Sequence, residues 1–166
     1  MPAPFQHETV LRDAVVTHLA TRADGDVVGG VFLDGTLGGG GHAEGLLEAT
    51  RSSSSVVGID RDPNALAAAS ARLAPYGARF RAVHGTYGEM ASLVADVPPL
   101  AGIVLDLGVS SPQLDHADRG FSFQQDGPVD MRMDPTRGID AASLIESLSE
   151  DELTSTIGRL GEEPRG

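Results

Sequence analysis

The stretch VFLDGTLGGGGHAEGLL, residues 31–47, decides the fold. A short apolar run ends at Asp34, and a glycine-dense turn follows it. A helix-like pattern resumes at His42, with two leucines soon after it as candidate core contacts. Strand, glycine turn and helix in this order bring backbone N–H groups and a helix N-terminus up to a ligand. The stretch therefore predicts the first βα unit of a parallel sheet.

The glycine turn matches neither of two common phosphate-binding patterns. The pattern GxxxxGK[ST] needs a lysine, and the sequence contains none, while GxGxxG fails because Glu44 stands where the last glycine should be. The four glycines of residues 38–41 leave the main chain open to a closely approaching cofactor. This suits a nucleoside cofactor without a pyrophosphate, and S-adenosylmethionine is the leading candidate. A flexible loop is the alternative.

Composition limits the classes of protein to consider. A chain of 166 residues can bury one core and is expected to form one domain. It has no cysteine, which excludes disulfides and cysteine-bound zinc. No apolar run is long enough to span a membrane and no signal peptide is visible, so we expect a cytoplasmic protein without a membrane partner. The net charge of −12 is unusual for a protein that binds nucleic acid.

The remaining pattern predicts strands that alternate with helix-length segments, which is typical of a parallel sheet with helices on its faces. Residues 108–138 show no periodicity, and their scattered apolar residues favour a functional segment over a disordered one. Strands are expected at residues 31–34, 56–60, 80–83 and 101–107, and helices at residues 9–20, 63–74, 88–95 and 149–160.

Three aspartates stand at the ends of predicted strands, where an open parallel sheet binds its ligands. Asp60 is expected to accept hydrogen bonds from both ribose hydroxyls of a nucleoside. Asp34 and Asp106 would complete a polar rim for hydroxyl and amine donors. A metal site is the rival interpretation, but nothing fixes a ligand set, so none is predicted.

Residues 111–113, Ser-Pro-Gln, follow the fourth predicted strand. In placement they resemble the Ser/Asp/Asn-Pro-Pro-aromatic loop of amino-group methyltransferases, which holds an exocyclic amine. Here there is one proline and no final aromatic residue, and a plain proline-containing turn is the alternative.

Six motifs follow one another along the chain: DGTLGGGGH (34–42), GIDRDP (58–63), HGTY (84–87), LDLGVSSPQLD (105–115), RGFSF (119–123) and DGPVDMRMDPTRG (126–138). Together they resemble the motifs of the bacterial 16S ribosomal RNA (cytosine-N4)-methyltransferases. The resemblance covers residues 7–163 and implies a Rossmann-like class I fold. It also implies methyl transfer from S-adenosylmethionine to a cytidine of 16S rRNA within the small ribosomal subunit.

The resemblance also implies the site residues. Asp106, Ser111 and Pro112 would be catalytic. Tyr87 would lie against the adenine, at a position where the family more often has phenylalanine. The implied cofactor contacts are Gly40, Gly41, His42, Asp60, Tyr87, Asp106 and Gln113.

Four predicted strands are fewer than a complete sheet of this fold contains. We therefore expect residues 1–140 to be the N-terminal part of the Rossmann-like domain, truncated after the fourth strand, and residues 141–166 to begin a helical insert. An unpaired fourth strand predicts self-association through the exposed sheet edge. Two alternatives to an active methyltransferase remain: a truncated, inactive S-adenosylmethionine-binding fragment, and a dinucleotide-dependent oxidoreductase.

Overall fold

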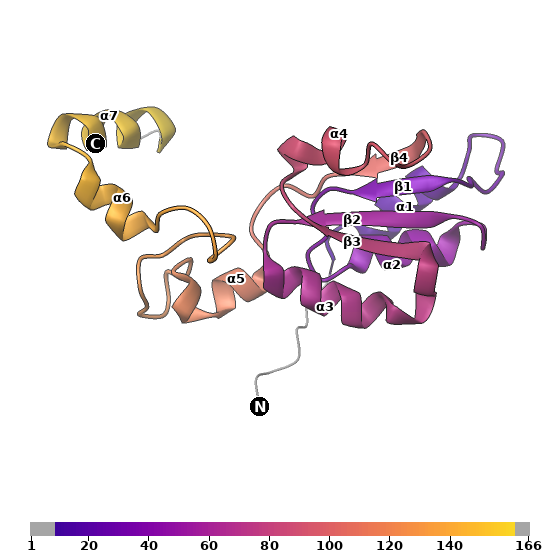
Figure 1. Ribbon diagram of the computed structural model, residues 1–166, viewed down its shortest axis with the longest axis horizontal. Coiled ribbons are helices and arrows are strands. Elements are labelled where there is room, and N and C mark those ends of the chain that lie inside the picture. The colour runs from indigo at the N-terminus through magenta and orange to yellow at the C-terminus, as the bar shows by residue number, and fades with distance from the viewer. Residues whose placement is uncertain (1–8, 162–166) are drawn as a thin grey trace. The chain divides into compact units, whose positions relative to one another are not determined.

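The computed structural model describes residues 9–161, and its central feature is an open sheet of four parallel strands (Figure 1). The strand order is β3-β2-β1-β4, so the direction of winding reverses between β1 and β4. Such a reversal is where sheets of this type bind ligands, beyond the carboxyl ends of the strands. The predicted Rossmann-like sheet is confirmed. Its strands are β1 (Val31–Asp34), β2 (Ser55–Asp60), β3 (Phe80–His84) and β4 (Leu100–Val104).

Helices cover both faces of this sheet. Figure 1 shows α2 (Gly41–Ala49) and α3 (Pro63–Leu73) on one side and α4 (Met90–Leu93) on the other. Alternate strand residues point to opposite faces, so Phe32 packs with the side of α2 and α3, whereas its neighbour Leu33 packs with the side of α4. The remaining elements of this part of the chain are α1 (Arg12–Ala20), η1 (Ala74–Arg79) and η2 (Tyr87–Glu89).

The start of α3 is fixed by its own sequence. The Asp62 side chain accepts a hydrogen bond from the backbone N–H of Asn64 at 2.9 Å. Pro63 occupies the first turn, where its missing N–H costs nothing. The predicted helix is confirmed. By contrast, α1 begins at Arg12 rather than at the predicted Thr9, because Leu11 before it has a left-handed backbone with φ 54°.

The fourth strand is shorter than predicted. It ends at Val104 rather than at residue 107, because its pairing partner β1 ends at Asp34, which lies opposite Val104. Gly35 then donates its N–H to the Val104 carbonyl at 2.9 Å as the chain turns away. Asp106 therefore lies two residues beyond the strand and not at its end, which corrects the prediction.

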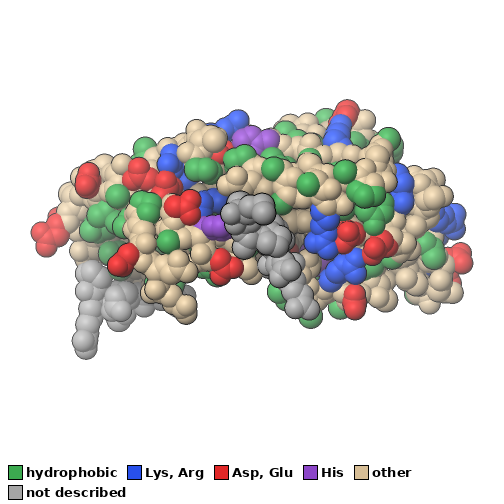
Figure 2. All heavy atoms as spheres, turned by 90° about the horizontal axis from the view of Figure 1, so that it is seen from below, with side chains coloured by type: hydrophobic (Ala, Val, Ile, Leu, Met, Phe, Trp, Pro, Cys, Tyr) green, Lys and Arg blue, Asp and Glu red, His purple; other side chains and the backbone are tan. Residues whose placement is uncertain are grey.

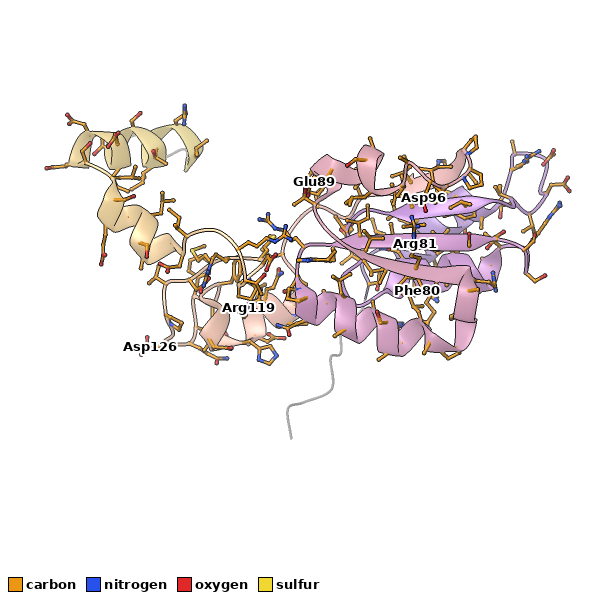
Figure 3. All side chains as sticks on the ribbon, in the orientation of Figure 1. Phe80, Arg81, Glu89, Asp96, Arg119 and Asp126 are labelled. Carbon is orange, nitrogen blue, oxygen red and sulfur yellow. The ribbon has the colours of Figure 1, made fainter. Side chains whose placement is uncertain are left out.

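Among the described residues β4 is an edge strand that pairs only with β1. Its Ile103 side chain is 47% exposed. At the opposite edge, the Arg81 side chain of β3 pairs with Asp96 at 2.6 Å and so ties the segment after α4 to the sheet (Figure 3).

The chain forms two compact units, Met1–Pro112 and Gln113–Gly166. The boundary falls inside α5 (Ser111–Asp115), and the predicted division after residue 140 stays a prediction. The second unit contains η3 (Ala117–Arg119), α6 (Ala141–Ser147) and α7 (Glu150–Leu160). Ser149 and Glu152 form a capping box at the start of α7.

The irregular segment between η3 and α6 is held by hydrogen bonds. Arg119, labelled in Figure 3, donates to the carbonyl oxygens of Arg132 at 3.2 Å and Met133 at 2.9 Å. Gly127 packs so closely that an added Cβ would lie 2.0 Å from the Ala117 carbonyl oxygen. Gly120 and Gly127 thus serve close main-chain packing within this unit, whereas nothing lies within 4 Å of a Cβ added to Gly138.

Candidate functional site

The site centres on Asp60, which ends β2 and holds the glycine turn. Its Oδ2 accepts the N–H of Gly38 at 2.8 Å, and its Oδ1 accepts the N–H of Asp62 at 2.8 Å. Burial raises the pKa of Asp60 above its ordinary value, although these two hydrogen bonds oppose the shift. Each carboxylate oxygen has a second lone pair, so the group can still accept hydrogen bonds from a ligand.

Asp34, at the end of β1, is a buried carboxyl group with unused bonding capacity. Its side chain is 1% exposed, and its Oδ1 accepts the N–H of Thr36 at 3.2 Å. Its Oδ2 has no partner within hydrogen-bonding geometry among residues 9–161, although the backbone N–H of Ala43 acts on the carboxylate and lowers its pKa. Burial raises its pKa to about 7, and the negative charges of Asp60 and Asp106 contribute. A buried oxygen of this kind is expected to meet a donor from outside the described structure.

Asp106 is exposed and is tied to the same turn through its backbone. Its N–H donates to the Thr36 hydroxyl oxygen at 2.6 Å, which joins residues 70 positions apart in the sequence. Gly35 makes this approach possible, because an added Cβ would lie 2.6 Å from Leu105 Cδ2. Sequence reasoning missed both Gly35 and Thr36. Their place directly after a strand-terminal aspartate was the one available signal.

The glycine turn is less open than the sequence suggested. Gly38 has φ 50°, and only the Thr36 carbonyl oxygen, at 3.9 Å, would meet its added Cβ. Gly40 has φ 81° and faces α3, where its Cβ would lie 3.2 Å from Ala69 Cβ. At Gly41 the Cβ would overlap the Thr9 side chain. The missing side chains of Gly40 and Gly41 therefore serve packing, and the predicted contacts of these two residues with a cofactor stay a prediction.

His42 and Tyr87 differ in the surroundings of their side chains. His42 is the second residue of α2 and is buried, with Nε2 3.1 Å from the Val10 carbonyl oxygen. Its ring thus serves the contact with the N-terminal segment. Tyr87 is half-exposed at the start of η2, and its Cβ would lie 3.6 Å from a Cβ added to Gly35. It therefore lies beside the turn.

Ser111, Pro112 and Gln113 form the start of α5 rather than an extended loop or a simple turn. Proline is well accommodated there because the first turn of a helix does not use its N–H. Gln113 is buried and belongs to the second unit. Its predicted contact with a cofactor, like the roles of Ser111 and Pro112, stays a prediction.

A family model extends over nearly the whole chain: the MraW methylase family matches residues 4–165. The chain belongs to the MraW methylase family. Among curated members, the ribosomal RNA small subunit methyltransferase H of Trichlorobacter lovleyi is 50% identical over 161 residues, which are 96% of this chain and 50% of that protein. The protein of the same name from Myxococcus xanthus is 53% identical over 96% of this chain and 49% of its own length.

This member of the MraW family thus spans about half the length of the curated relatives it matches. Among solved structures, a proposed RNA methyltransferase of Pyrococcus horikoshii has a TM-score of 0.42 at 20% identity, over 50% of this chain and 41% of that one. The fold assignment rests instead on the sheet topology described above. In the described part of the chain, no helix could cross a membrane and no cluster of side chains could hold a metal ion.

Proposed function

We propose that this chain supplies the S-adenosylmethionine site of an enzyme that methylates the N4 amine of a cytidine in 16S ribosomal RNA. Membership of the MraW methylase family supports methyl transfer. The relatives' name, ribosomal RNA small subunit methyltransferase, supports the substrate class. The proposed function also implies a cytoplasmic protein with the small ribosomal subunit as its partner.

The observation that carries the proposal is the unpartnered Oδ2 of Asp34. This oxygen lies at the carboxyl ends of the strands, beside the glycine turn that Asp60 holds. The amino-acid part of S-adenosylmethionine carries an ammonium group, which supplies the N–H donors that a buried carboxylate lacks. The acceptor oxygens of the described residues therefore fit the N–H donors of this cofactor.

The other site residues would each contact a different part of the cofactor. Asp60 would accept hydrogen bonds from the ribose hydroxyls through its free lone pairs, while Gly38, whose open face adjoins it, allows close approach. Tyr87 would cover the adenine with its half-exposed ring. Gly41 and His42, in the first turn of α2, would offer backbone N–H donors. Gly40 precedes them, and because its N–H already donates to the Leu37 carbonyl oxygen at 2.8 Å, it would contact the cofactor by close approach alone. Gln113 would complete the set.

When bound, the cofactor supplies an electrophilic methyl group. The protein's part is chiefly to place the amine nitrogen on line with it, since positioning alone can supply much of the rate. Asp106 and Ser111 carry oxygens that can accept the N4 hydrogens, and Pro112 would fix the backbone between them and the second unit. The N4 proton leaves to an acceptor such as Asp106, which is exposed.

The charge of the chain bears on how it would hold RNA. On the face that Figure 2 presents, basic side chains adjoin acidic ones. Arg12 pairs with Glu48 at 2.7 Å, for example, so its charge is already compensated. An RNA partner would therefore meet mixed charge on this face, and the remaining length of the relatives is where a basic surface is expected.

The test is calorimetric titration of the folded 166-residue chain with S-adenosylmethionine. Asp60→Ala should weaken binding by roughly 1.5–3 kcal/mol, because charge-assisted hydrogen bonds to the ribose are lost. Asp96→Ala is the matched control, since this aspartate pairs with Arg81 instead. No binding by any of the three proteins would refute the cofactor assignment, and equal affinities of all three would refute the role of Asp60.

A second candidate is a cofactor-binding fragment without turnover, which the half-length match favours. Methyl incorporation into unmodified small subunits separates the two: binding without incorporation supports the fragment. The edge strand β4 with its exposed Ile103 also supports self-association, because an unpaired edge can pair with a second copy. Sedimentation that shows only monomer at high protein concentration would contradict this.

A further inference from the structure

We propose that Thr36 is a positioning residue that holds Asp106 in register with the cofactor site. This inference rests on the proposed function, because it gives Asp106 a role in binding or catalysis. Neither the resemblance nor the strand-end pattern assigned any role to Thr36.

Thr36 makes two hydrogen bonds that face opposite parts of the site. Its backbone N–H donates to Asp34 Oδ1 at 3.2 Å, and its hydroxyl oxygen accepts the N–H of Asp106 at 2.6 Å. A continuous chain of contacts thus runs from the buried carboxylate of β1, through Thr36, to the segment after β4.

This link matters because the strand ladder no longer fixes Asp106. Pairing between β1 and β4 ends at Asp34 and Val104, and the Gly35 N–H makes the last backbone contact with β4. Beyond that point the side chains of Leu105 and Leu107 are exposed, at 42% and 65%. The hydrogen bond from Asp106 to Thr36 carries the sheet's register past the end of β4.

The Asp106 backbone also leads directly to Ser111 and Pro112, five and six residues further along. A shift of about 1 Å in a positioning group can cost a large factor in rate. Fixing the backbone N–H of Asp106 therefore defines where the segment that carries these residues leaves the sheet.

The experiment compares Thr36→Val, which keeps the shape and removes the hydroxyl, with Thr36→Ser, which keeps the hydroxyl. The first readout is hydrogen exchange at the Asp106 amide, measured by NMR without cofactor. Thr36→Val should speed this exchange about tenfold, the equivalent of one ordinary hydrogen bond, whereas Thr36→Ser should leave it near the starting rate.

The second readout is S-adenosylmethionine affinity in a double-mutant cycle with Asp106→Ala. Thr36→Val should weaken binding about tenfold in the unsubstituted chain and have no further effect when Asp106 is already alanine. An equal loss in both backgrounds would show that Thr36 does not act through Asp106, and would overturn the inference.

The two readouts separate this inference from the proposed function. If the unsubstituted chain binds no S-adenosylmethionine, the proposed function fails, and the exchange rate alone decides whether Thr36 holds Asp106. Unchanged exchange at the Asp106 amide in Thr36→Val overturns the inference even where cofactor binding is normal.

Discussion

Replacing Gly40 with alanine is expected to destabilise the first unit by roughly 2–5 kcal/mol, although alanine adds a single methyl group. One part of the loss comes from the backbone: φ at Gly40 is 81°, and a left-handed conformation costs an L-residue about 1–2 kcal/mol. The other part comes from crowding. The new Cβ would lie 3.1 Å from Leu73 Cδ1 and 3.2 Å from Ala69 Cβ, both buried, and overpacking of a core costs about 1–3 kcal/mol.

The matched control is Gly25→Ala. Gly25 has φ 88°, close to the value at Gly40, but nothing lies within 4 Å of its added Cβ. This variant should therefore show the backbone cost alone, about 1–2 kcal/mol. Urea unfolding of both variants, followed by circular dichroism, measures the difference.

If Gly40→Ala loses no more free energy of unfolding than Gly25→Ala, the close packing of the glycine turn on α3 is refuted. Gly40→Val, with a larger side chain, should damage the fold itself through the same contact with α3.

Three further predictions concern single side chains. The Asp34 pKa of about 7 lies above the ordinary 3.8, so between these two pH values the folded state keeps a proton that the unfolded chain loses. The free energy of unfolding should therefore fall by up to ~4 kcal/mol as pH rises from 3.8 to 7. Asp34→Asn should abolish this pH dependence in urea unfolding at pH 5 and 8, and an unchanged pH dependence would contradict the raised pKa of Asp34. Tyr87→Phe should keep the affinity for S-adenosylmethionine and Tyr87→Ala should lower it by ~1 kcal/mol in calorimetry; equal affinities would remove Tyr87 from the site. Arg137 is 70% exposed and lies 3.8 Å from its partner Asp134, whereas Arg132 is held by Asp130 at 2.6 Å. Arg137→Gln should therefore reduce the salt slope of RNA binding by about one, and Arg132→Gln should not; the reverse order would show that the Arg132–Asp130 ion pair opens for RNA.

The sequence predicted the sheet well because the signals for its strands are local. Buried apolar runs bounded by turn residues gave all four strands, and Asp62 with Pro63 gave the start of α3. The one strand boundary that was clearly wrong, the end of β4, depends on where the neighbouring strand turns away. That is a contact between distant parts of the chain, which no local pattern records.

The candidate site shows the same difference between features with a local sequence signal and features that depend on contacts between distant residues. The positions of Asp34 and Asp60 at strand ends follow from the apolar runs before them and are confirmed. The direction in which Gly40 faces was not predictable, because glycine in a turn looks the same whether a ligand or a helix approaches it. The hydrogen bond from Asp106 to Thr36 was equally invisible, since it joins residues 70 positions apart.

The grouping of carboxylates around the turn has a consequence for turnover. Asp60 and Asp106 act electrostatically on Asp34, so the site has a negative potential. The proposed cofactor carries a sulfonium cation, whereas the thioether left after methyl transfer is neutral at sulfur. The same acidic rim would therefore attract the spent molecule less than the fresh one, and exchange of product for cofactor would be favoured by charge alone. Added salt would weaken this discrimination, so inhibition by product should increase with ionic strength.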